Sequence, residues 1–128
     1  MNSQEITVTA KWTAQPGMLD ELKAIWQAVA AQVEANEPGL LRLDAYDVDD
    51  TEAVIIHEVF ADAVALGGHL GGTAAQFFPK LMEIATPGPY FFCGDVPDEI
   101  MQVAYGMNMG AVFGTREFGF SRSPAEAS

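Results

Sequence analysis

Apolar residues in this chain change their spacing from every second position to every third or fourth and back again, and the order of these changes constrains the fold most. Residues 6–12 alternate apolar and polar side chains, which is typical of a half-buried strand. Residues 18–35 repeat apolar side chains at helical spacing, which predicts an amphipathic helix that ends at Glu37-Pro38-Gly39. Alternation returns over residues 40–48 and 53–60, and the short turn between them predicts a hairpin.

A second helical region follows the hairpin and contains a break. Asp62 is a good N-cap, because its carboxylate can accept backbone N–H bonds in the first turn. Gly71-Gly72 interrupts the helical pattern, and Thr73 is another N-cap from which the helix restarts. Pro79 lies in this second part, so we expect either a kink or a first turn that begins later than Thr73.

The last third of the chain predicts one more strand and then an added helix and strand. Residues 86–89 contain two prolines and are interpreted as a rigid connection, whereas residues 90–93 are typical of a short buried strand. Residues 97–107 have apolar side chains on one helical face, and residues 111–120 have the pattern of a last strand.

The order of the first six elements, β-α-β-β-α-β, is that of a ferredoxin-like α+β fold, in which two helices lie on one face of an antiparallel sheet. We expect a single domain over residues 1–128, with a core over about 5–95 and a C-terminal helix-strand extension over about 96–122. The strand at 53–60 has apolar side chains on both faces, and two helices cover only one face. The sheet of a second copy would cover the other face, so the pattern predicts a homodimer.

Acidic residues outnumber basic residues by 18 to 6, which gives a formal net charge of −12. Such a surface repels phosphate backbones and anionic lipids, so neither nucleic acid nor a membrane is an expected partner. The chain has no apolar run of the roughly 18–20 residues that cross a bilayer and no secretory pattern at its N-terminus. Its one cysteine, Cys93, cannot form an internal disulfide, so we expect a cytoplasmic protein.

A histidine set among glycines is the most unusual local feature. His69 is flanked by Gly67, Gly68, Gly71 and Gly72. Each glycine inside a helix costs roughly 0.5–1 kcal/mol relative to alanine. A segment that departs from a local rule around an ionisable residue is a place to expect function. The glycines indicate either close backbone packing or room for a ligand, and the sequence does not choose between the two.

Five short motifs, taken in this order and at this spacing, resemble the antibiotic biosynthesis monooxygenase-like family over residues 5–95. They are Pro16-Gly17, Glu37-Pro38-Gly39, Glu58-Val59-Phe60, His69 and Phe78. The resemblance implies a dimeric α/β barrel. Members of this family include cofactor-free oxygenases that oxidise phenolic or quinol substrates with molecular oxygen, haem-degrading enzymes and proteins of unknown role, so the function has to be argued from the site.

Haem chemistry fits the resemblance poorly. The haem-degrading relatives carry an asparagine on the first strand and a tryptophan near the end of the third, and these positions fall at Ala10 and about Val59 here. Ala10 cannot donate a side-chain hydrogen bond, and Val59 cannot distort a porphyrin as a bulky indole would. We therefore expect neither haem binding nor any other cofactor.

His69, His57 and Glu58 are the candidate catalytic residues. By resemblance, His69 would be a base or a hydrogen-bond partner for a phenolic substrate, or a haem ligand. The alternative is that it supports the loop before the helix restarts. His57 and Glu58 are neighbours on a strand, so their side chains point to opposite faces. Glu58 suits a structural role better, such as an ion pair with Arg42 across the hairpin. His57 would need a partner such as Asp44 or a residue of the C-terminal tail.

Aromatic residues are candidates for lining a pocket for a flat substrate, although the same spacing suits packing in the core. These candidates are Trp12, Tyr46, Phe60, Phe77 and Phe78. No metal site is expected, because the two histidines lie twelve residues apart on different elements and form no recognisable ligand set.

The sequence favours a cofactor-independent monooxygenase that acts on a small aromatic or quinol-type substrate, with His69 as the base that removes a substrate proton. A non-catalytic dimeric module that binds a hydrophobic metabolite or a partner protein is the alternative, and isomerase or lactone-forming chemistry would use the same base. An apolar pocket whose only titratable group is a solvent-facing His69 would favour the binding module.

Overall fold

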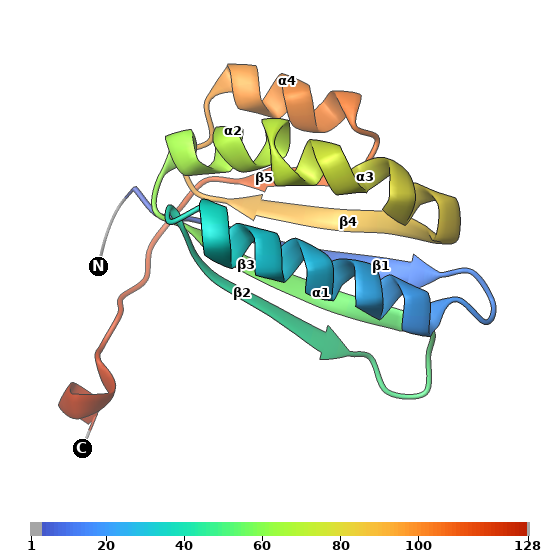
Figure 1. The fold of residues 1–128 in the computed structure, drawn as a ribbon. Helices are drawn as coiled ribbons and strands as arrows, with labels where there is room; N and C mark the ends of the chain where they lie inside the picture. The colour runs from blue at the N-terminus through green and yellow to red at the C-terminus, as the bar shows by residue number, and fades with distance from the viewer. Residues whose placement is uncertain (1–3, 128) are drawn as a thin grey trace.

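In the part of the chain that the structure describes, five strands form one sheet, and four α-helices lie against one of its faces (Figure 1). The structure is a computed structural model that describes residues 4–127. Its elements are β1 (Ile6–Ala14), α1 (Leu19–Asn36), β2 (Leu40–Asp47), β3 (Ala53–Phe60), α2 (Ala63–Gly71), α3 (Thr73–Ile84), β4 (Ala85–Cys93), α4 (Asp98–Gly106), β5 (Ala111–Gly114) and a short 3-10 helix, Pro124–Ala127.

The strand order in the sheet is β2-β3-β1-β4-β5. The pairs β2–β3, β3–β1 and β1–β4 are all antiparallel, which confirms the ferredoxin-like arrangement expected from the sequence. β5 pairs with β4 in parallel, so the whole sheet is mixed rather than antiparallel. The reason is that α4 lies between β4 and β5, and a helical crossover returns the chain to the same end of the sheet.

The predicted start of the fourth strand and the predicted end of the fifth are both wrong. In each case the strand that pairs with it sets where the strand begins or ends. β4 begins at Ala85, so the proline-containing connection is part of the strand. β5 pairs only with residues 90–93, which leaves Pro87 on a free edge where its missing N–H breaks no ladder bond. The last strand ends at Gly114 because β4 itself ends at Cys93. The chain then leaves the sheet (Figure 1).

The helix after β3 breaks where the glycines predict. The Asp62 side chain accepts a hydrogen bond from the backbone N–H of Ala65 at 2.9 Å and begins α2. α2 ends at Gly71 and α3 begins at Thr73. Pro79 lies inside α3, so the expectation of a later first turn is wrong.

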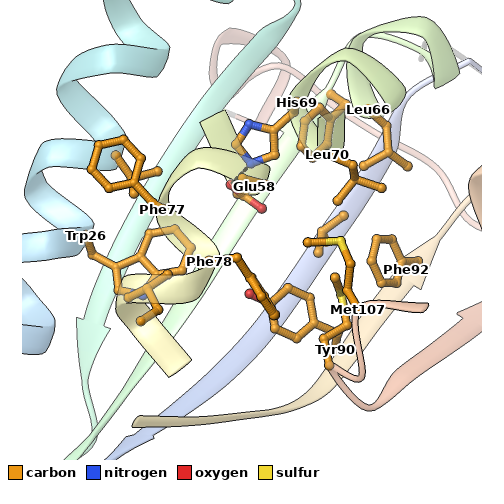
Figure 2. Close-up of a pocket in the computed structure, with 16 residues that line it drawn as sticks. Trp26, Glu58, Leu66, His69, Leu70, Phe77, Phe78, Tyr90, Phe92 and Met107 are labelled. Carbon is orange, nitrogen blue, oxygen red and sulfur yellow. Dashed lines mark ion pairs between the residues drawn. The ribbon is translucent and has the colours of Figure 1, made fainter. Parts of the chain in front are cut away.

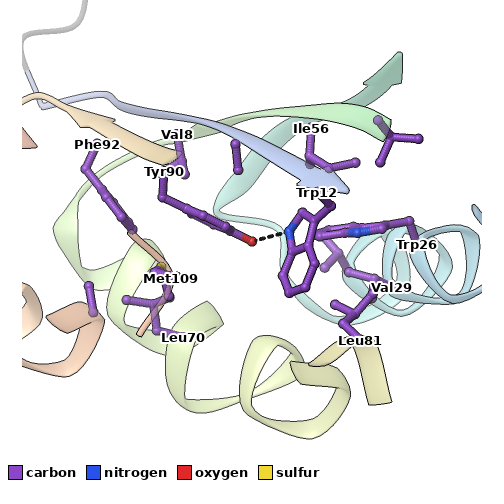
Figure 3. Close-up of a cluster of buried hydrophobic side chains, with 14 of the residues drawn as sticks. Val8, Trp12, Trp26, Val29, Ile56, Leu70, Leu81, Tyr90, Phe92 and Met109 are labelled. Atoms are coloured by element: carbon purple, nitrogen blue, oxygen red, sulfur yellow. Dashed lines mark hydrogen bonds between the residues drawn. The ribbon is translucent and has the colours of Figure 1, made fainter. Parts of the chain in front are cut away.

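The face of the sheet beneath the helices holds the hydrophobic core (Figure 3). Trp12 on β1 is fully buried, and its ring makes edge contacts with Trp26, Phe78 and Tyr90 at centroid distances of 5.4–6.3 Å. Its indole N–H donates to the Tyr90 hydroxyl at 2.7 Å. Such contacts between α1, α3 and the two neighbouring strands β1 and β4 fix the helices on the sheet.

The opposite face of the sheet carries no helix in the described part of the chain (Figure 1). Apolar side chains are nevertheless exposed on it, with Phe91 at 44% and Val112 at 50% side by side on β4 and β5. Tyr46 and Ile55 add a second exposed pair on β2 and β3. We call this surface the open face. None of the helices within residues 4–127 is long and apolar enough to cross a membrane.

Candidate functional site

A small cavity lies between the sheet and helices α2 and α3 (Figure 2). Its volume is about 30 Å³, which is room for about one or two water molecules. Most of the side chains around it are apolar, and the charged or hydroxyl-bearing groups in its wall belong to Glu58, His69 and Tyr90. The cavity therefore combines a dry lining with a few polar groups, as ligand sites do.

Glu58 is a buried carboxyl group with an unmet hydrogen-bonding requirement. The alternation of β3 places it on the covered face, where the residue is 4% exposed. Its Oε2 atom has no hydrogen-bond partner among residues 4–127. Burial raises the pKa of Glu58 above its usual value and the nearby Glu37 raises it further, whereas His69 acts in the opposite direction. A carboxyl group in this setting holds a proton more readily than one in water.

His69 lies between two carboxyl groups. It sits on α2, is 4% exposed, and packs against the ring of Phe60. Its Nδ1 atom is 2.9 Å from Glu37 Oε1, and its Nε2 atom is 3.4 Å from Glu58 Oε2. Both ring nitrogens therefore face a carboxyl oxygen, and His69 has no free nitrogen to offer a haem iron.

Glu37 lies on the side of His69 that is nearer the protein surface. It is the C-cap residue of α1, and its side chain is 18% exposed. Its Oε2 atom accepts a hydrogen bond from the Thr73 hydroxyl, which in turn accepts one from the Gln32 side-chain amide at 3.2 Å. Glu37, His69 and Glu58 thus form a row from the surface to the cavity, which we call the carboxyl–histidine row.

Tyr90 on β4 contributes a hydroxyl group to the cavity wall. Its oxygen accepts the hydrogen bond from Trp12, so its own proton is free to be donated to a ligand. Burial raises the pKa of Tyr90 far above its usual value, and the nearby Glu58 raises it further. Tyr90 therefore remains a neutral donor.

Three of the predicted aromatic residues line the cavity, namely Phe60, Phe77 and Phe78. Trp12 is not among the lining residues, but it touches Phe78 and holds Tyr90. Tyr46 is half-exposed on β2 and lies away from this cavity.

The two histidines are not brought together. The alternation of β3 directs His57 to the face opposite Glu58, where its Nδ1 atom lies 3.0 Å from the Thr9 hydroxyl. The expected ion pair between Glu58 and Arg42 is wrong, because the register places Val59 opposite Arg42. The expected partner of His57 is also wrong, because Asp44 pairs with Arg42 instead.

Two of the four glycines around His69, Gly67 and Gly72, lie where an added Cβ atom would crowd a neighbouring atom. A Cβ atom on Gly67 would lie 3.3 Å from Ile100 of α4, so the absent side chain allows α2 and α4 to approach closely. Gly68 and Gly71 have no neighbour within 4 Å of such an atom, and nothing in the structure explains them. None of the four glycines lines the cavity.

Sequence reasoning missed Glu37, Thr73 and Tyr90 as members of the site. The sequence pattern places Glu37 in a helix stop and in a family motif, Thr73 at a cap and Tyr90 in a buried strand, and none of these interpretations assigns the residue to the site. The signal for Tyr90 lay in its alternation with Phe92 on β4, which places both residues on the covered face. No cluster of three His, Cys, Asp or Glu residues in the described part of the chain could hold a metal ion.

Comparison with known structures supports the same fold. MupZ from Pseudomonas fluorescens is similar with a TM-score of 0.75 and 23% identity, over 95% of this chain and 97% of that one. A mutant of SnoaB, a cofactor-independent oxygenase from Streptomyces nogalater, is similar with a TM-score of 0.61 and 20% identity, over 70% of this chain and 90% of that one. The overlap with MupZ is long enough to include residues of the C-terminal extension. At these identities the likeness shows the fold alone.

Comparison with curated proteins gave no match. The family model for antibiotic biosynthesis monooxygenases matches residues 5–79, which is more than half of the chain and spans β1 through most of α3. This match includes all three members of the carboxyl–histidine row. The chain therefore belongs to the antibiotic biosynthesis monooxygenase family.

Proposed function

We propose that the protein is a cofactor-independent oxygenase that binds a small hydroxylated aromatic substrate in the cavity beside Glu58 and His69. The observation that carries this proposal is a buried histidine, held between two carboxyl groups, at the wall of an apolar cavity. SnoaB, a cofactor-independent oxygenase, has a similar fold. A buried titratable pair also favours an enzyme over a passive binding module, whose pocket would not need one.

The proposed reaction begins with removal of a phenolic proton by the pair of Glu58 and His69. The O–H bond of the substrate breaks, and the resulting anion gives one electron to molecular oxygen. The substrate radical and superoxide combine through a C–O bond, and the proton returns to the peroxide. Loss of water then leaves a quinone, so one phenol and one molecule of oxygen give one quinone and one water. The protein contributes binding, water exclusion and electrostatics.

Substrate entry requires the lining of the cavity to move, because about 30 Å³ is too small for an aromatic ring. Met107, which follows α4, and Phe77 on α3 are only partly buried and line the cavity. A methionine side chain is unbranched and adapts to new shapes. We therefore assign the opening movement to the wall formed by these two residues.

A homodimer is part of the proposal. The exposed apolar residues of the open face, Tyr46, Ile55, Phe91 and Val112, are what a second sheet would bury. Because the open face lies opposite the cavity, the two copies would keep separate sites.

Oxygen uptake tests the proposed function. An oxygen electrode records consumption with a panel of phenols, naphthols and hydroquinones, and quinone formation is followed by absorbance. We expect uptake above buffer with at least one substrate and a large loss of that rate in His69→Ala. Absence of uptake with every substrate would contradict the proposal.

A further inference from the structure

The polar groups of the cavity wall differ in what they can still bind. Both ring nitrogens of His69 face carboxyl oxygens, at 2.9 Å and 3.4 Å. The Oε2 atom of Glu58, in contrast, has no hydrogen-bond partner among residues 4–127 although it is fully buried. A buried oxygen without a partner has lost its hydrogen bonds to water with nothing in return, and a ligand hydroxyl would restore one. Glu58 is therefore the group with an unused acceptor.

The hydrogen bonds of Glu37 fix how protons are distributed along the carboxyl–histidine row. Glu37 accepts from the Thr73 hydroxyl through one oxygen and faces His69 Nδ1 with the other. A carboxylate can only accept, so Nδ1 carries a hydrogen. The remaining proton lies on either His69 Nε2 or Glu58, and the row has a net charge of −1 in either arrangement.

Accepting one more proton makes the row electrically neutral. Glu58 is then a neutral acid, His69 an imidazolium and Glu37 a carboxylate. Loss of net charge is favourable in a cavity with an apolar lining, where an unbalanced charge is expensive. The groups that face Glu58 are His69 from α2, Glu37 beyond it from α1, and Tyr90 from β4.

We propose that Glu58 is the catalytic residue that touches the substrate, and that its carboxyl group binds the phenolic hydroxyl and takes its proton. His69 and Glu37 are positioning residues that set the orientation and basicity of Glu58. The O–H bond of the phenol breaks and an O–H bond on Glu58 forms, with no change in oxidation state. This inference rests on the proposed binding of a phenol in the cavity, but it does not depend on the subsequent reaction with oxygen.

Binding of para-nitrophenol tests this assignment, because this electron-poor phenol reports its ionisation by absorbance and is a poor electron donor to oxygen. The wild-type protein is titrated with the phenol at a pH where the free phenol is mostly protonated. We expect the bound phenol to show the phenolate spectrum. In Glu58→Gln we expect affinity to fall by about 10- to 100-fold, with the residual bound phenol neutral.

Substitution of a positioning residue should change proton transfer from the phenol to Glu58 but leave the affinity for the phenol nearly unchanged. In His69→Gln and Glu37→Gln we expect affinity to stay within about threefold of wild type, because the acceptor on Glu58 remains, while the bound phenolate fraction falls and requires a higher pH. Glu34→Gln on the exposed side of α1 is the matched control and should match wild type. Glu58→Asp keeps a carboxyl group and should recover part of the phenolate signal.

Three results would overturn the assignment. One is absence of binding by the wild-type protein, and another is an unchanged affinity and spectrum in a folded Glu58→Gln. The third is the reverse pattern, in which His69→Gln loses affinity and Glu58→Gln does not. Circular dichroism and the melting temperature verify that each variant is folded. Phenolate binding without oxygen uptake with any substrate would contradict the proposed function and leave the role of Glu58 standing.

Discussion

The two faces of the sheet are built from the same strands but offer opposite environments. His57 and Glu58 are consecutive in β3, yet His57 meets the Thr9 hydroxyl on the open face while Glu58 is buried under the helices. On the covered face the Oε2 atom of Glu58 has no hydrogen-bond partner among residues 4–127. On the open face the exposed groups include large apolar side chains, such as Phe91 and Val112.

This difference indicates what each face is for. His57 is only partly buried and has the Thr9 hydroxyl as a hydrogen-bond partner, so it needs no ligand to satisfy it. A buried carboxyl without a partner is costly and rare, which makes it a candidate for ligand binding. Exposed apolar groups on a flat sheet are instead candidates for contact with another protein surface. We therefore expect chemistry on the covered face and association on the open face.

The largest expected effect separates the two neighbours on β3. Glu58→Gln should lower the rate of substrate-dependent oxygen uptake by about 10²- to 10⁴-fold, the range for loss of a general acid or base. His57→Gln changes the residue directly before Glu58, whose side chain lies on the opposite face, and should leave the rate within about twofold of wild type. Steady-state oxygen consumption checks both variants. Equal losses in the two variants would remove the distinction between the faces.

The order of the elements and the alternation of β3 could be predicted because periodicity is a local property of the sequence. That His57 and Glu58 point in opposite directions follows from alternation alone. The contacts that Glu37 makes with His69 and Thr73 join residues 32 and 36 positions apart. They depend on how the end of α1 meets the break between α2 and α3, and no local pattern encodes that meeting.

The predicted strand boundaries are wrong where pairing with another strand, rather than local composition, determines them. Residues 86–89 belong to β4 because β1 pairs with Thr86 and Pro87 and because the other edge is free at Pro87. β5 stops at Gly114 because its partner β4 stops. The length of the strand with which each one pairs cannot be predicted from its own sequence.

A smaller effect is expected on the open face. Phe91→Asp places a charge within the proposed sheet-to-sheet contact and should weaken the homodimer by about 30-fold or more, as for a residue that contributes strongly to an interface. Phe118→Asp is the control, because Phe118 is also an exposed phenylalanine, at 87% against 44% for Phe91, but lies beyond β5. Analytical ultracentrifugation measures the dimer dissociation constant. A wild-type protein that is monomeric at all concentrations would contradict the association assigned to this face.

The smallest effect is a change in the pH dependence of stability. The pKa of Glu58 is raised on folding, so the native state keeps a proton that the unfolded chain loses above about 4.5. Stability should therefore fall as pH rises from this value toward the raised pKa, and the penalty is fully present above the raised pKa. Glu58→Gln has no such penalty, so its melting temperature should exceed that of wild type by a few degrees at about pH 8 and lose this advantage at about pH 4.

The matched variant for this experiment is again His57→Gln, measured by thermal unfolding over the same pH range. Its melting curve should follow that of wild type more closely, because the residue is only partly buried. A Glu58→Gln variant that is less stable than wild type at every pH would show that the carboxylate is a net stabilising group.

A crystal structure of the protein with bound para-nitrophenol tests the central claim most directly, because it shows which face of the sheet holds the ligand. We predict that the ring lies between the sheet and helices α2 and α3, with Met107 and Phe77 displaced and the phenolic oxygen within hydrogen-bond distance of Glu58. A ring bound on the open face, or in the cavity with its oxygen directed away from Glu58, would contradict the account.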